Sequence, residues 1–222
     1  MTTSTSNPDS KYRSSWSLPG SAERNSQPIA RALSPLLSPA ATSSSSSSSR
    51  KPVILEVASG FGHQIHAVAS EYPHCRFHPS EADAYLRDEI NTRTAGLPNV
   101  VKAESLVKVT GEHSYTTWQE KQNLQKKKDC LMGYVTQQGY RNLLSRSHGW
   151  IAIYGAFNEN GAFTSEGNAK FDADIRGRNP VFGLRDIQNE LVPLAARHGY
   201  ELTDRLEMPA GNLFLIFRLR KE

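Results

Sequence analysis

The stretch VILEVASGFGHQIHAV, residues 53–68, constrains the fold more than any other part of this chain. A continuous apolar run is typical of a strand that is covered on both faces of a parallel sheet. The run carries one acidic residue, Glu56, and it ends in a turn with Gly60 and Gly62, after which a helical pattern begins. This order of strand, glycine turn and helix predicts an α/β sheet with a ligand site at the carboxyl end of the strand.

The same alternation of strands and helices continues towards the C-terminus. We expect strands at 53–58, 75–83, 99–109, 129–132, 150–157, 200–208 and 212–220, and helices at 63–72, 84–96, 135–147 and 184–199. Such alternation predicts a doubly wound, Rossmann-like sheet with right-handed crossovers. Because the last two strands follow each other without a helix, we also expect an antiparallel strand at one edge of the sheet.

The chain divides into segments of different composition. We expect a disordered tail at 1–20, a helix that docks on the domain at 21–38, a polyserine linker at 39–52 and a single α/β domain at 53–222. The tail and the linker are rich in Ser and poor in large apolar side chains, so they cannot bury enough surface to fold by themselves. The helix is indicated by apolar residues at helical spacing, namely Ile29, Leu33, Leu36 and Leu37.

Composition narrows the possible functions. The net charge of +4 is modest, and no basic stripe with interleaved aromatic residues indicates nucleic-acid binding. Cys75 and Cys130 are far apart, and His63 and His66 have no third partner in sequence, so we predict no metal site. No apolar run approaches the roughly 20 residues of a membrane span, and no secretory signal is evident. We therefore expect a cytoplasmic protein with access to the nucleus, and the sequence leaves its oligomeric state open.

The residues after the first strand indicate which ligand the site would hold. The pattern is E-x-x-x-G-x-G, with Ile65 where a dinucleotide site would place a third glycine. The carboxylate of Glu56 would repel a pyrophosphate but attract an ammonium group, which disfavours NAD and favours a cationic ligand that carries an amino acid. Glu81 ends the second strand, about 20 residues further on, where a carboxylate that binds ribose is expected. S-adenosylmethionine (SAM) fits both carboxylates, whereas a tight turn with a solvent-facing Glu81 is the alternative.

Beyond these residues, the sequence resembles class I SAM-dependent methyltransferases, and most closely the family that includes methyltransferase-like protein 26 and its bacterial relatives. The resemblance covers nearly the whole chain after residue 20. It rests on AERN with PI behind it, ILEVASGFG, PSEAD, AGLPNV, YGAF, FTSEGNAKFDADIRGRNPVFGLRD and EMPAGNLFLIF.

This resemblance implies a seven-stranded methyltransferase sheet that binds SAM over its first two strands. It implies that Glu56 binds the methionine amino group, directly or through water, and that Glu81 binds the ribose hydroxyls. The site residues implied around the cofactor are Ser59, Gly60 and Gly62, with Arg24 and Asn25 from the N-terminal helix closing the pocket. Helix capping and surface pairing are the alternative roles for Arg24 and Asn25.

Two departures from the family pattern leave an alternative function open. Val107-Lys108-Val109 stands where the family has Leu-Asp-Val, so an acid that would contact adenine is missing. Several residues are also missing after Met132, at the end of a central strand where substrate and methyl donor would meet. Either the chain is a pseudo-methyltransferase with impaired SAM binding that acts as an interaction module, or it is a truncated version of an active enzyme.

The segment 154–183 is long and rich in Gly and Asn, as lids and binding loops often are. We place the selection of an unknown small-molecule or protein substrate there. The candidate residues are Tyr154, Asn168, Asp172, Arg176 and Arg185, each with a structural alternative such as a helix-start acid for Asp172. Methyl transfer depends chiefly on in-line positioning, so no catalytic base is identified. The sequence thus predicts a SAM-dependent methyltransferase-like protein.

Overall fold

The computed structural model describes residues 20–39, 51–105, 130–133, 149–178, 180 and 182–220. Its first half contains helices α1 (Ser21–Ala32), α2 (Ser34–Leu37), α4 (His63–Glu71) and α5 (Ala84–Arg93), and strands β1 (Val53–Val57), β2 (Arg76–Ser80) and β3 (Cys130–Gly133). The second half contains β4 (Trp150–Gly155), β5 (Phe157–Glu159), β6 (Ala162–Phe163), α7 (Glu166–Arg178), β7 (Arg185–Asp186), η2 (Ile187–Leu191), α8 (Val192–Ala196), β8 (Tyr200–Met208), η3 (Pro209–Gly211) and β9 (Asn212–Leu219).

The main sheet has six strands in the order β2-β1-β3-β4-β9-β8. Strands β2, β1, β3 and β4 are parallel, whereas β9 runs antiparallel to both β4 and β8. The strand predicted at 99–109 is represented by two isolated parallel bridges to β2, Phe77–Val100 and Ser80–Glu104. The described residues therefore form a mixed α/β sheet of six strands, with a further segment beside β2.

The predicted antiparallel edge strand was wrong in its position. The antiparallel strand is β9, which lies between β4 and β8, so the edge strand is β8. Burial explains this order: β9 is apolar and buried from Leu213 to Phe217, as an inner strand requires, whereas β8 is largely exposed. A strand with Glu201, Asp204 and Glu207 is suited to an edge, where charges discourage pairing with another chain.

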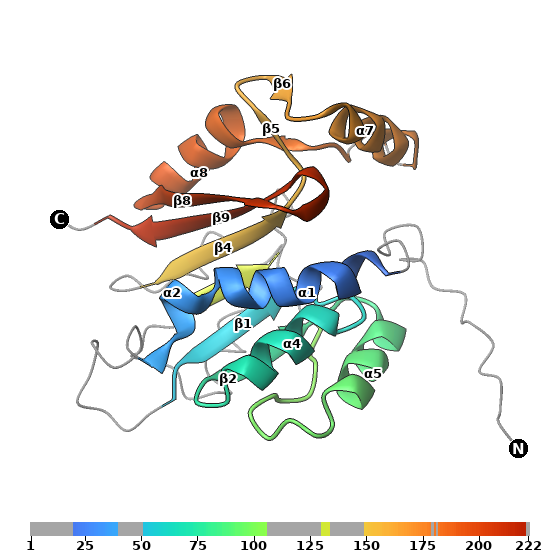
Figure 1. Cartoon of the computed structure of the whole chain (residues 1–222), viewed down its shortest axis with the longest axis vertical. Helices are drawn as coiled ribbons and strands as arrows, with labels where there is room; N and C mark the ends of the chain where they lie inside the picture. The colour runs from blue at the N-terminus through green and yellow to red at the C-terminus, as the bar shows by residue number, and fades with distance from the viewer. Residues whose placement is uncertain are drawn as a thin grey trace, which may run out of the picture.

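Helices cover both faces of the sheet, because alternate residues of β4 enter two separate cores. Trp150, Ala152 and Tyr154 belong to the core under α1, α2, α4 and α5. Ile153, with Ile151 packed beside it, belongs to the core under η2 and α8. Figure 1 shows α1 and α4 side by side across the sheet, with α8 next to β8. This arrangement of helices on both faces agrees with the predicted doubly wound architecture.

A second, three-stranded sheet in the order β6-β5-β7 forms with α7 a separate layer on the side of the edge strand β8 (Figure 1). Figure 1 places this layer, which we call the cap (residues 156–186), at the opposite end of the molecule from α5 and β2. The sequence predicted a long lid or binding loop here, and the structure contains the 13-residue helix α7 within it. The Ser165 hydroxyl accepts the backbone N–H of Asn168 and so caps the first turn of α7.

Several predictions fall on residues outside the described part of the chain. These are the tail at 1–20 apart from Gly20, most of the linker at 39–52, Lys108, the residues that follow Gly133 and the helix at 135–147. The central strand predicted at 129–132 is β3, one residue further on. No helix within the described ranges is long and apolar enough to cross a membrane.

Candidate functional site

Glu56 lies near the carboxyl end of β1, where it is only 5% exposed. Its backbone carbonyl accepts the Ser80 hydroxyl at 2.7 Å, which joins β1 to β2. Its side-chain oxygen Oε2 is buried, and it has no hydrogen-bond partner among the described residues. Burial raises the pKa of Glu56 to about 8, a hydrogen bond from Ser59 lowers it, and the nearby carboxylate of Glu81 raises it. The site thus contains a buried acid with one oxygen left for a donor or a cation.

The turn after β1 adopts backbone conformations that favour glycine, with φ of +58° at Ala58, +56° at Gly60 and +78° at Gly62. The two glycines have different surroundings. A Cβ at Gly62 would come within 3.1 Å of the Ile90 Cα, so this glycine lets α5 pack closely. A Cβ at Gly60 would meet no described residue within 4 Å, so within the described part of the chain this backbone is uncovered. Gly60 is therefore the position at which a ligand can approach the turn.

Glu81 connects this turn to the end of β2. Its Oε2 accepts the Gly60 N–H at 3.0 Å, and its Oε1 accepts the N–H groups of Ala82 and Asp83 at 2.7 and 3.3 Å. Because a carboxylate can accept about four hydrogen bonds, these three leave capacity for a ligand hydroxyl. The Ser59 N–H also donates to the Ser80 carbonyl at 3.0 Å. The structure thus brings together the predicted residues at the ends of β1 and β2.

The N-terminal helix supplies the other two predicted cofactor residues. Asn25 is buried and 8% exposed, whereas Arg24 is exposed. Both belong to α1, which packs on α4, the helix that follows the glycine turn. A role for either residue in closing a cofactor pocket remains a prediction.

Tyr154 is the substrate candidate nearest to these strand ends. The backbone register aligns Glu56 with Met132 of β3, and Met132 with Ala152 of β4. Tyr154 lies two residues further along β4, on the same face as Ala152, and its side chain is 8% exposed. It is therefore placed near the same edge of the sheet as Glu56, two strands away.

The remaining substrate candidates belong to the cap, and their contacts lie within it or with η2 and the β8–β9 hairpin. The Asn168 side chain donates to the Thr164 hydroxyl at 2.7 Å and to the Gly211 carbonyl at 3.1 Å. Asp172 accepts the Arg176 guanidinium and the Leu184 N–H, both at 2.7 Å. It lies in the middle of α7, so the alternative of a helix-start acid is wrong. Arg185 Nε lies 4.0 Å from Glu190 Oε2. A substrate role for these residues remains a prediction.

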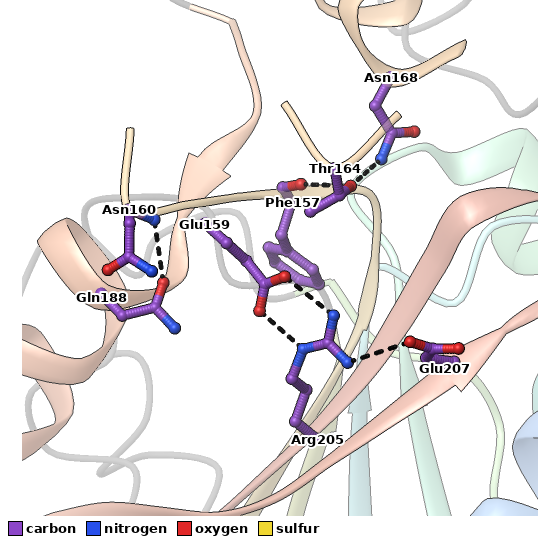
Figure 2. Close-up of polar contacts among 8 residues, drawn as sticks. All are labelled: Phe157, Glu159, Asn160, Thr164, Asn168, Gln188, Arg205 and Glu207. Carbon is purple, nitrogen blue, oxygen red and sulfur yellow. Dashed lines mark hydrogen bonds and ion pairs between the residues drawn. The ribbon is translucent and has the colours of Figure 1, made fainter. Parts of the chain in front are cut away.

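A charged pair fastens the cap to the edge strand β8. Arg205 donates from Nε to Glu159 Oε1 at 2.6 Å and from Nη2 to Glu159 Oε2 at 2.8 Å, as Figure 2 shows. The Glu207 carboxylate lies 3.6 Å from the same guanidinium. The hydrogen bonds from Arg205 hold the pKa of Glu159 below its usual value. The cap is thus attached to the β8–β9 hairpin at Glu159 and, through Asn168, at Gly211.

Sequence reasoning missed three residues that shape the site. Ala58 has the strained φ of a glycine but no feature in sequence that reveals it. Asp83 caps α5 by accepting the Tyr85 N–H at 3.0 Å. Arg87 donates to the carbonyls of Glu81 and Ala82. Its place in the first turn of a predicted helix was the one feature of the sequence that could have indicated this role. Within the described part of the chain, no group of three His, Cys, Asp or Glu side chains could hold a metal ion.

Solved structures with the same fold include several methyltransferases. An O-methyltransferase family protein from Burkholderia thailandensis has a TM-score of 0.61 and 15% identity, with 89% of this chain and 57% of that chain covered. The pyocyanin biosynthetic protein PhzM has a TM-score of 0.57 and 14% identity, with 87% of this chain and 55% of that chain covered. A geranyl diphosphate methyltransferase, solved with GPP and sinefungin, has a TM-score of 0.56 and 8% identity, with 86% of this chain and 78% of that chain covered.

At these identities the comparison establishes the fold alone, so this is a protein of methyltransferase fold. The chain spans a little over half the length of PhzM and of the Burkholderia protein. A family model described as "Protein of unknown function (DUF938)" matches residues 17–219. The chain belongs to that family.

Proposed function

We propose that this protein binds SAM at the carboxyl ends of β1 and β2 and transfers a methyl group to a substrate that is not identified. The observation that carries the proposal is the buried Glu56 oxygen, which has no hydrogen-bond partner among the described residues and lies beside a glycine turn that no described residue covers at Gly60. A buried polar atom without a partner is costly, so its presence at a strand end favours a ligand that donates to it. An ammonium group meets that requirement.

The described residues fit the parts of SAM. Glu56 would bind the amino group of the methionyl portion, and Ser59, Gly60 and Gly62 would line that portion and the ribose. Glu81, with one acceptor position left, would bind a ribose hydroxyl, while Arg24 and Asn25 would close the pocket from α1. SAM supplies an electrophilic methyl group on a sulfonium. The role of the protein would be to hold this group in line with the acceptor atom.

Finer points of the sequence analysis belong to the same proposal. We include membership of the methyltransferase-like protein 26 group, a seventh strand at residues 100–104 beside β2, and substrate selection by Tyr154 and the cap. The alternative of an impaired pseudo-methyltransferase depends on Lys108 and on the residues after Met132. Both lie outside the described residues or at their margin, so binding measurements must decide between the two.

Calorimetric titration with SAM and with S-adenosylhomocysteine (SAH) tests the proposal. Saturable binding to the wild-type protein is expected, and it should be lost in Glu56→Gln, which keeps the shape but not the charge. Glu201→Gln, the same change on the exposed edge strand β8, is the matched control and should bind normally. Absence of binding at millimolar ligand would contradict the proposal and favour the impaired alternative.

Proton release gives a second readout of the same site. With a pKa of about 8, Glu56 is protonated at pH 7. Pairing with an ammonium group would ionise it, so binding should release close to one proton. The measured heat should then differ between phosphate and Tris buffers, whose ionisation enthalpies differ. Binding with the same heat in both buffers would exclude Glu56 as the partner of the amino group.

A further inference from the structure

Arg87 of α5 holds the turn that carries Glu81. Its Nη1 atom donates to the Glu81 carbonyl and to the Ala82 carbonyl, both at 2.8 Å. One guanidinium nitrogen therefore binds two consecutive carbonyls in the three residues that separate β2 from α5. Arg87 is half-buried and lies in the first turn of α5.

The two carbonyls belong to the same peptide units as the two N–H groups that hold the Glu81 carboxylate. The carbonyl of Glu81 and the N–H of Ala82 form one peptide unit, and the carbonyl of Ala82 and the N–H of Asp83 form the next. A trans peptide is planar, with C=O and N–H pointing in opposite directions, and the described residues contain no cis peptide. By fixing both carbonyls, Arg87 fixes the direction of both N–H groups towards Glu81 Oε1.

The first turn of a helix is an unusual position for an arginine. The N-terminus of a helix is the positive end of its dipole, so acidic side chains are favoured there and basic ones are not. The first turn of α5 contains Arg87 and no acidic residue, although Asp83 precedes it as the N-cap. The two carbonyl contacts direct the positive charge of Arg87 to the turn that carries Glu81.

We propose that Arg87 is a positioning residue for the ribose-binding carboxylate of Glu81, an inference that rests on the proposed SAM site. Arg87 acts through the two peptide units and does not touch the cofactor itself. With the N–H groups of Ala82 and Asp83 fixed on Oε1 and that of Gly60 on Oε2, the carboxylate is held in one orientation before a ligand arrives.

A double-mutant cycle measured by SAH calorimetry tests this inference. Arg87→Met keeps much of the side-chain volume but removes the donors, and we expect about a tenfold loss of SAH affinity, as for other residues that orient a ligand-binding group. Glu81→Ala should weaken binding by about 30-fold, as expected for a lost charged hydrogen bond. Adding Arg87→Met to Glu81→Ala should then cause no further loss, because Arg87 has no carboxylate left to orient.

An independent tenfold loss from Arg87→Met in the Glu81→Ala background, or no loss in the wild-type background, would overturn the inference. Asn99→Ala is the structural control, because the buried Asn99 side chain donates to the Ala69 and Tyr72 carbonyls at 2.9 and 3.3 Å, at the C-terminal end of α4. It should lower the unfolding midpoint and leave SAH affinity unchanged. If Arg87→Met does not fold, Arg87→Lys is used, with a smaller loss that must likewise vanish in the Glu81→Ala background.

The outcomes separate this inference from the proposed function. If the wild-type protein binds neither SAM nor SAH, the proposed function fails. If the wild-type protein binds and Glu81→Ala weakens binding, but the effects of the two substitutions are additive, only the role of Arg87 fails.

Discussion

Replacing Glu56 by Gln should make the ligand-free protein more stable at neutral and alkaline pH. The wild-type carboxyl is 5% exposed and has an oxygen without a partner among the described residues, so its ionised form is poorly solvated. A glutamine has nearly the same shape and cannot ionise. The substitution thus removes the cost of a buried charge, although it should also remove SAM binding.

The size and sign of this effect follow from the pKa. Burial raises the pKa of Glu56 from 4.5 to about 8. Between these two values the folded protein keeps a proton that the unfolded chain has lost, so the free energy of unfolding falls as the pH rises. Each pH unit in this window lowers the free energy of unfolding by about 1.36 kcal/mol. The total loss between pH 4.5 and pH 8 is therefore at most about 5 kcal/mol.

Urea unfolding of wild-type and Glu56→Gln proteins at pH 5, 6.5 and 8 measures the difference. The two should have similar free energies of unfolding at pH 5, and the variant should become progressively more stable above it. Glu201→Gln, on the exposed edge strand, should follow the wild-type profile. Parallel profiles for wild type and Glu56→Gln from pH 5 to pH 8 would show that Glu56 ionises normally, and the physical basis of the proposed site would be wrong.

The remaining predictions concern the glycine turn and the cap. Gly60→Ala and Gly62→Ala each add about 1 kcal/mol of backbone strain. Only a Cβ at Gly62 would meet the α5 backbone, at 3.1 Å, so Gly62→Ala should lose more free energy of unfolding in urea. Gly60→Ala should lose more SAH affinity by calorimetry. The reverse order would contradict the packing role of Gly62 and the ligand role of Gly60. Asn168→Ala removes two hydrogen bonds of a buried side chain and should cost about 1–3 kcal/mol in urea unfolding, whereas a cost near zero would show that α7 is held otherwise. A double-mutant cycle on Glu159 and Arg205, both partly exposed, should give a coupling of about 0.5–1 kcal/mol that falls in high salt, and a salt-independent coupling would argue against an ion pair.

Most of the main sheet could be predicted because its strands are apolar and short. The runs that became β1, β4 and β9 are continuous and buried, and their boundaries lie within about two residues of the expected ones. The order of β8 and β9 was recognisable in principle, because an inner strand must be apolar on both faces and an edge strand need not be. The sequence analysis predicted an antiparallel strand at one edge without using this difference in burial.

Helix α7 could not be predicted from apolar periodicity, because its buried residues are polar. Asn168 and Asp172 are spaced four residues apart and face the interior, while Phe171 is 40% exposed. A search for apolar residues at helical spacing finds no pattern in such a segment. Because the segment is rich in Gly and Asn, its sequence indicated a loop.

Part of the candidate site could be predicted from the sequence, for a different reason. Glu56 interrupts an apolar strand, and a buried charge in that position demands an explanation from sequence alone. The difference between Gly60 and Gly62 was not readable, because it depends on how closely α5 approaches the turn. Arg87 was overlooked because its contacts are with backbone carbonyls, which leave no pattern in the sequence beyond a basic residue in the first turn of a helix.

Two unfavourable features of the described structure lie close together at the end of β1, where the ligand site is proposed. Ala58 adopts a left-handed conformation that costs about 1–2 kcal/mol for a residue with a Cβ, and Glu56 lies buried two residues before it. Elsewhere in the described chain, buried carboxyls such as Asp172 and Asp186 accept several hydrogen bonds. Strained backbone of this kind clusters at active sites and ligand clamps, which agrees with a ligand site here. Because a cationic ligand would relieve the cost of ionised Glu56, and this cost grows with pH, stabilisation by SAM should be greater at pH 8 than at pH 5.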